Sequence, residues 1–167
     1  MLKKLIKNIK LIIGGVMGKE RQVPLLGKFM SDDVEVYVAL DEDLLTFKNV
    51  MFGLVQQRSS KQIAIYVDQN YLHSDSYTRE FILAHELGHF NCGHFKDKHN
   101  VGFLNAFLRP IRAGLNHVDS KEIEADAYAV ELIGITKVIH GITYISTQLP
   151  HNAELRKRLQ IVLDAVK

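Results

Sequence analysis

The sequence predicts an α+β protein, because strand patterns lie in its first half and helix patterns lie in its second. Residues 34–40, VEVYVAL, alternate as a strand does, and residues 62–67, QIAIYV, are rich in β-branched and aromatic side chains. Three later segments, 77–90, 119–134 and 152–166, carry apolar residues at helical spacing. We therefore expect a small mixed sheet that packs on helices from the second half.

The size and composition of the chain predict one globular domain over residues 19–167, preceded by a separate N-terminal segment. The chain has 167 residues, of which 47% are hydrophobic and 24% are charged, as in ordinary globular proteins. Its one cysteine, Cys92, cannot close a disulfide within the chain and cannot form a cysteine-rich zinc ribbon. A lone cysteine fits a reducing compartment, so we expect a cytoplasmic protein.

The N-terminal segment is strongly basic. Residues 1–28 hold seven Lys and Arg against one Glu, a net charge of +6, which leaves −4 on the remainder of a chain whose net charge is +2. Residues 2–13, LKKLIKNIKLII, predict a basic amphipathic helix within a unit spanning residues 1–18. It is too short to cross a membrane, and its lysines interrupt any signal-peptide core. Two roles stay open: peripheral contact with an anionic membrane, or packing on the body.

The remaining elements follow from local signals. Residues 44–57 predict either a short helix or a strand, and the polar residues 58–61 predict a turn. Asp75 and Ser76 can cap the helix that follows them. Residues 101–115 are apolar at helical spacing, with a break near Pro110.

The predicted helix over 77–90 contains His85-Glu86-Leu87-Gly88-His89, an HExxH motif. Two histidines four residues apart on a helix project from nearly the same face, where both imidazoles can bind one Zn²⁺. Glu86 then lies beside the metal, where it can accept a proton from a metal-activated water and return it to a leaving amine. Without a metal, these polar groups would need other partners inside an apolar helix.

A zinc site of this kind needs a third protein ligand. The metzincin pattern would place a histidine at position 95, but Phe95 stands there, so that class is excluded. We interpret His94, at the expected helix end, as a helix-terminal residue.

The third ligand is expected in Glu122-Ile123-Glu124-Ala125-Asp126. Glu122 and Asp126 share a helix face, so Glu122 can bind the metal while Asp126 accepts the ring N–H of a ligating histidine. Two alternatives stay open. Glu122 can instead close a capping box with Asp119, and Glu124 on the opposite face is the competing ligand.

These two motifs resemble the gluzincin metallopeptidases. The segments Ala84–Phe90 and Glu122–Ala129 are most similar to the HtpX/CAAX-prenyl-protease group, the ImmA/IrrE-type peptidases and the minimal single-domain gluzincins. The resemblance implies a zincin-like fold, in which a sheet lies over the HExxH helix. It also implies an edge strand to which an extended peptide can add, and residues 62–67 are the candidate. Some members accompany a DNA-binding domain; no helix-turn-helix is evident here, so no nucleic-acid partner is expected.

We therefore expect a zinc-dependent endopeptidase acting on a peptide or protein substrate, with one Zn²⁺ on His85, His89 and Glu122, Glu86 as general base and Asp126 as an orienting group. The alternative is a regulatory or latent protein of the same fold that acts by binding a partner protein or a membrane surface. The group that stabilises the oxyanion is left open among five residues: His117, His140, Tyr144, His151 and Arg156. Residues 149–156 resemble an HtpX-like stretch in which His-Pro precedes an arginine, although the order here is Pro-His.

Overall fold

The structure is a computed structural model that describes residues 8–12, 20–41, 53–94 and 119–165. The described residues form five strands and five helices, which confirms the α+β class. The chain divides into two compact units, residues 1–72 and residues 73–167, and each is described by itself. The zincin-like arrangement and the single domain over 19–167 stay predictions.

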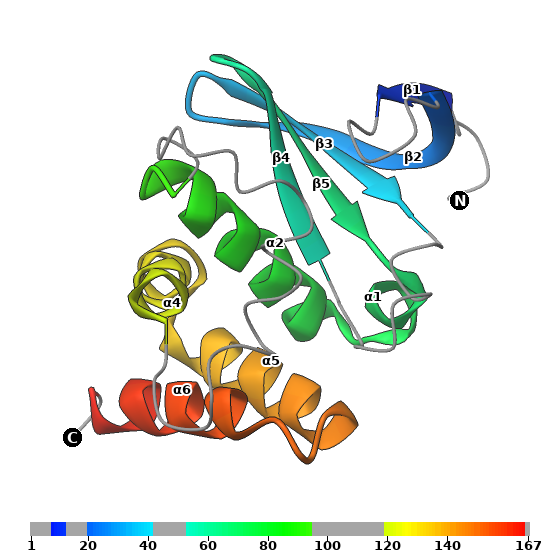
Figure 1. The fold of residues 1–167 in the computed structure, drawn as a ribbon. Coiled ribbons are helices and arrows are strands. Elements are labelled where there is room, and N and C mark those ends of the chain that lie inside the picture. Colours follow the sequence, from blue (N-terminus) through cyan, green and yellow to red (C-terminus); the bar gives the residue numbers. More distant parts are fainter. Residues whose placement is uncertain (1–7, 13–19, 42–52, 95–118, 166–167) are drawn as a thin grey trace. The chain divides into compact units, whose positions relative to one another are not determined.

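The first unit contains a mixed sheet with strand order β1-β2-β3-β5-β4 (Figure 1). Its strands are β1 (Asn8–Ile12), β2 (Glu20–Ser31), β3 (Val34–Leu40), β4 (Gly53–Ser59) and β5 (Gln62–Val67). β3 and β5 pair in parallel, and the other neighbours pair antiparallel. The two strands predicted over 34–40 and 62–67 are thus confirmed. Of the undecided segment 44–57, the part from Gly53 onward is a strand, and residues 44–52 lie outside the described residues.

β5 is an inner strand of this sheet. It pairs with β3 on one side and with β4 on the other, and Ile63 and Val67 are completely buried. A strand buried on both faces carries a continuous apolar run, which accounts for the sequence QIAIYV. The expectation that residues 62–67 form the edge strand is therefore wrong, because the edge next to β5 belongs to β4.

Turn chemistry sets the connections within the sheet. β2 and β3 are joined by Asp32 and Asp33, and Asp32 adopts φ 50°, a left-handed conformation that aspartate tolerates better than most residues. β4 and β5 are joined at Ser60 and Lys61, which confirms the turn predicted over 58–61 at its last two positions.

Residues 8–12 form a strand, so the helix expected over residues 2–13 is wrong for this segment. β1 pairs antiparallel with β2, with Ile9 opposite Val23 and Leu11 opposite Arg21. A short helix is marginal by itself, and pairing along an existing strand gives the backbone a hydrogen-bonded alternative that β-branched residues favour. Residues 1–7 and 13–19 lie outside the described residues. The membrane contact expected for residues 2–13 stays a prediction.

The helices follow the local signals closely. They are α1 (Gln69–His73), α2 (Ser76–Asn91), α4 (Ser120–Ile133), α5 (Ile135–Gln148) and α6 (Ala153–Asp164). The helices predicted over 77–90, 119–134 and 152–166 correspond to α2, α4 and α6, whereas α5 was not expected. Within the described residues, no helix combines the length and apolarity needed to cross a bilayer. The apolar segment 101–115 lies outside them.

Candidate metal centre

The HExxH residues lie in the second half of α2. Asp75 caps the helix by accepting the backbone N–H of Thr78 at 2.9 Å, as its position in the sequence predicted. His85 and His89 follow one helical turn apart, and their Nε2 atoms are 3.1 Å from each other. Glu86 is 9% exposed. The helix thus brings two imidazole nitrogens together, and the buried side chain of Glu86 follows the first of these histidines directly in the chain.

α4 brings a carboxylate to the same point. Glu122 lies in its first turn, one oxygen 3.2 Å from Nε2 of His85 and the other 3.3 Å from Nε2 of His89. The two helices approach closely because position 88 has no side chain: a Cβ on Gly88 would lie 2.8 Å from the Cα of Ala125. Of the roles open to Glu122, this geometry supports the ligand over the helix cap.

These three residues fit a zinc ion. A tetrahedral ion with bonds of about 2.0–2.1 Å separates its ligand atoms by about 3.3 Å. The two Nε2 atoms are 3.1 Å apart, and each lies 3.2 or 3.3 Å from one of the two carboxylate oxygens of Glu122. Nδ1 of His85 donates to Asp126 at 2.9 Å, which leaves Nε2 directed at Glu122, either as an N–H when the ring is protonated or as a lone pair for a bound ion. The carboxylate of Glu122 therefore needs a positive partner at this point, which a bound cation or a proton on His85 can supply.

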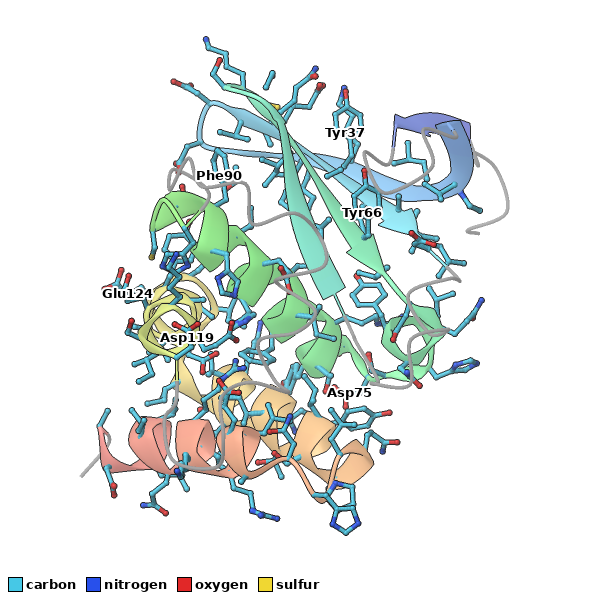
Figure 2. All side chains as sticks on the ribbon, in the orientation of Figure 1. Tyr37, Tyr66, Asp75, Phe90, Asp119 and Glu124 are labelled. Carbon is cyan, nitrogen blue, oxygen red and sulfur yellow. The ribbon has the colours of Figure 1, made fainter. Side chains whose placement is uncertain are left out.

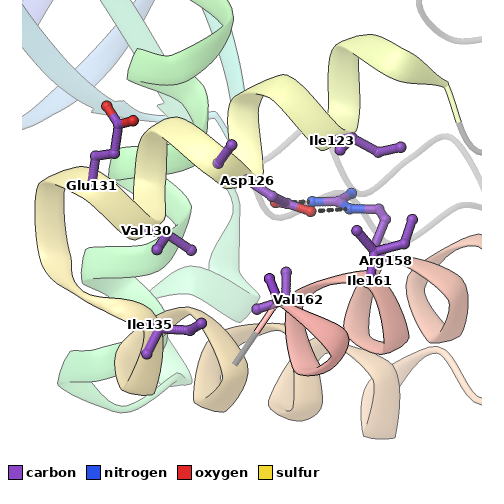
Figure 3. A pocket seen from close by; sticks show the side chains of 10 residues that line it. Ile123, Asp126, Val130, Glu131, Ile135, Arg158, Ile161 and Val162 are labelled. Atoms are coloured by element: carbon purple, nitrogen blue, oxygen red, sulfur yellow. Dashed lines mark hydrogen bonds and ion pairs between the residues drawn. The ribbon is translucent and has the colours of Figure 1, made fainter. Parts of the chain in front are cut away.

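Asp126 occupies the orienting position that the sequence predicted, and it is 2% exposed. Its carboxylate accepts the Nδ1–H of His85 and is held by a residue that the sequence analysis did not assign to the site, Arg158 on α6. The Arg158 guanidinium donates to both oxygens of Asp126, at 2.7 and 2.6 Å (Figure 3), and its other nitrogen donates to Glu122 at 2.9 Å. Arg158 thus connects the candidate ligand on α4 with the group that orients His85.

The electrostatics of the centre follow from these contacts. Burial would raise the pKa of Glu122, but hydrogen bonds to both histidines and the nearby Arg158 charge hold it well below its usual range. Burial likewise opposes ionisation of Asp126, yet the Arg158 charge lowers the pKa of that carboxyl. Burial and Arg158 disfavour a charged His85; the two carboxylates outweigh them and raise its pKa to about 9. The two carboxylates therefore favour a positive charge beside them, either a proton on His85 or a bound cation.

A second cluster lies beside the first. Cys92, His94 and Glu124 bring a thiol, an imidazole and a carboxylate within 4.8 Å of one another. Nε2 of His94 is 3.1 Å from Glu124, which is labelled on α4 in Figure 2. His94 is thus more than the helix-terminal residue expected from the sequence. Glu124, the competing ligand, contacts His94 and belongs to this second cluster. Burial, together with Glu124 and Glu131, raises the pKa of the Cys92 thiol.

The oxyanion candidates are not gathered at the centre. His140 pairs with Asp75 at 2.9 Å on the surface, and Arg156 donates to the Pro150 carbonyl at 2.6 Å. Tyr144 lies on α5 and is half-buried, His151 is exposed, and His117 is outside the described residues. The oxyanion-stabilising group stays unassigned.

A cavity of about 270 Å³ adjoins the centre between α4 and α6. Asp126 and Arg158 line it together with apolar side chains such as Val130 and Val162, as Figure 3 shows. The ion pair that supports the candidate ligands is therefore also part of the wall of an otherwise largely apolar space.

Comparisons of this chain with family models, with curated proteins and with solved structures find no match. The resemblance to the gluzincins therefore depends on the HExxH and ExxAD motifs.

Replacing Gly88 with alanine should separate α2 from α4. The new Cβ would meet backbone atoms of Ala125, which cannot rotate away, so the helices must shift. We expect zinc affinity to fall at least about 10-fold, since misplaced ligands lose favourable geometry. Gly27→Ala is the control, because a Cβ on Gly27 in β2 would meet no atom of the described residues within 4 Å and the α2–α4 contact would stay as it is. Equal zinc affinities for both variants, measured by chelator competition, would contradict this reasoning.

The ligand assignment is tested by comparing two glutamates on α4. Glu122→Gln should sharply lower zinc occupancy, because its oxygens lie 3.2 and 3.3 Å from the two histidines. Glu124→Gln should leave most of the zinc bound, because Glu124 contacts His94 and not the two ligating Nε2 atoms, and the amide oxygen of glutamine can still accept from His94. Metal analysis of the purified variants gives the answer. Zinc loss in the Glu124 variant alone would move the assignment to that residue.

Proposed function

We propose that this protein is a zinc-dependent endopeptidase of the gluzincin type. One Zn²⁺ would be held by His85, His89 and Glu122, with Glu86 as general base. The observation that carries the proposal is the convergence of two Nε2 atoms from α2 and a carboxylate from α4, at separations of 3.1 to 3.3 Å. Polar groups of this kind are costly beside an apolar helix core, and a bound cation offsets that cost.

Each side chain has a defined task in this proposal. Bound zinc would supply Lewis-acid activation of water and of the scissile carbonyl. Glu86, next to a ligand on α2, accepts the proton of the attacking water and delivers it to the leaving amine. Asp126 fixes the ring of His85 so that its Nε2 faces Glu122, and Arg158 fixes Asp126.

The test combines metal analysis with peptide-library cleavage on the full chain. We expect one zinc per chain, cleavage that stops on chelation, and recovery when zinc is added back. A purified chain that takes up no zinc would refute the proposal. A zinc-loaded chain that cleaves no peptide in the library would favour the alternative, a regulatory or latent protein that binds a partner.

A further inference from the structure

The end of α2 turns back so that one histidine lies against another. Gly93 adopts φ 74°, a conformation that glycine allows readily, and the backbone N–H of His94 donates to the carbonyl of His89 at 3.1 Å. The turn returns the His94 ring to the helix, where Nδ1 of His94 and Nδ1 of His89 are 2.8 Å apart. The His94 side chain is 7% exposed. The contact is therefore a partly buried hydrogen bond between two imidazoles.

The direction of this hydrogen bond follows from Glu124. A carboxylate only accepts, so Nε2 of His94, 3.1 Å from Glu124, carries the hydrogen. A neutral imidazole has one N–H, and Nδ1 of His94 is then a lone pair that accepts from Nδ1 of His89. Nε2 of His89 is left with its lone pair, directed at Glu122 at 3.3 Å. The exposed carboxylate of Glu124 thus determines, through the His94 and His89 rings, that Nε2 of His89 presents a lone pair to the metal position.

We propose that His94 and Glu124 form a positioning pair that orients His89 for zinc, as Asp126 and Arg158 orient His85. This inference depends on the proposed metal centre and extends it to two residues that do not touch the ion. The two ligating imidazoles are then oriented in the same way: each donates its Nδ1–H to a partner side chain, which is itself held by a residue from another element.

The other use of this cluster is a second metal ion on Cys92, His94 and Glu124. Such an ion would take the lone pair of His94 Nε2 and place the hydrogen on Nδ1, facing Nδ1 of His89. His89 would then carry its own hydrogen on Nε2, where the first ion needs a lone pair. With neutral histidines, the two ions therefore cannot be bound at the same time. If His94 instead orients His89, zinc can still bind to His85, His89 and Glu122.

Replacement of His94 tests the proposal. His94→Leu should weaken zinc binding about 10–100-fold in chelator competition on the full chain, the range for removing an orienting partner of a metal ligand. His94→Gln should restore most of the affinity, because its amide oxygen can accept from His89 while its NH₂ donates to Glu124. Glu124→Ala should shift affinity in the same direction as His94→Leu. In ¹⁵N spectra of the zinc-loaded wild type, His89 should carry its hydrogen on Nδ1.

Cys92→Ser is the matched control, because it removes the thiol and leaves both imidazoles and Glu124 in place. It should bind zinc as the wild type does. Unchanged zinc affinity in His94→Leu would overturn the positioning pair while leaving the proposed centre standing. Two zinc ions per wild-type chain, one of them lost in Cys92→Ser, would overturn it in favour of a second metal site. A wild-type chain that binds no zinc would instead refute the proposed function on which the pair depends.

Discussion

Glu86→Gln is expected to retain zinc and the native fold while losing peptidase activity by at least about 100-fold, since general acid–base catalysis typically contributes 10²–10⁴. Glutamine keeps the shape of the side chain but cannot accept the proton of an attacking water. Glu86 is 9% exposed and follows His85 directly, so the change is made beside the ligands without altering any of them. Steady-state cleavage of one library peptide, with zinc content measured on the same samples, checks this result.

The control is Glu80→Gln on the same helix. Glu80 pairs with Lys137 on the surface and is removed from the centre by more than one helical turn, so the same chemical change there should leave activity unchanged. A Glu86→Gln variant that cleaves at the wild-type rate would exclude Glu86 as the general base. The inactive variant can also distinguish a substrate from a binding partner in a pull-down. A substrate should stay bound to Glu86→Gln but not to the wild type, whereas a simple partner should bind both.

The helices that carry the centre were predictable because their signals are local. Asp75, Asp119 and Asn152 each precede a run of helical spacing, and each accepts a backbone N–H at the start of its helix. The HExxH spacing fixes the relative positions of His85 and His89 by helix geometry alone. The sequence therefore predicts this half of the centre without any knowledge of tertiary packing.

The part that depends on packing between distant segments was not predictable in the same way. Arg156 was considered because of its sequence neighbourhood, yet it is exposed, and Arg158 is the arginine that enters the centre. One signal in the sequence did point to Arg158. It shares a face of α6 with Leu155 and Val162, so this arginine lies on the otherwise apolar, buried face of the helix. A guanidinium at such a position needs buried carboxylates, and α4 supplies them.

The sheet shows the same distinction between local and distant information. The run QIAIYV identified a strand, but its place in the sheet depends on partners elsewhere in the chain. Its lack of alternation indicates burial on both faces, which fits an inner strand better than an edge. For residues 8–12, helical spacing of apolar residues was outweighed by pairing with β2, which periodicity cannot reveal.

Arg158→Met should lower the free energy of unfolding of the metal-free protein by about 3–5 kcal/mol, the cost of leaving a buried charge without its partner. Asp126 is 2% exposed and would keep only its hydrogen bond to His85, while Glu122 would lose the donor at 2.9 Å. Typical domains are stable by only about 5–15 kcal/mol, so the loss should be large in urea denaturation. Arg158→Lys should recover little, because a single ammonium cannot reproduce the two-pronged contact.

Arg156→Met is the matched control for this loss. Arg156 lies two residues away on the same helix, is exposed, and donates to the carbonyl of Pro150. Its replacement should change stability by less than about 0.5 kcal/mol, as at most surface sites. In the double variant Arg158→Met with Asp126→Asn, part of the loss should be recovered, because no buried carboxylate at position 126 is left unpaired. Equal losses for Arg156→Met and Arg158→Met would mean that Arg158 contributes no more than a surface arginine, and that the ligands on α4 are supported by something other than this ion pair.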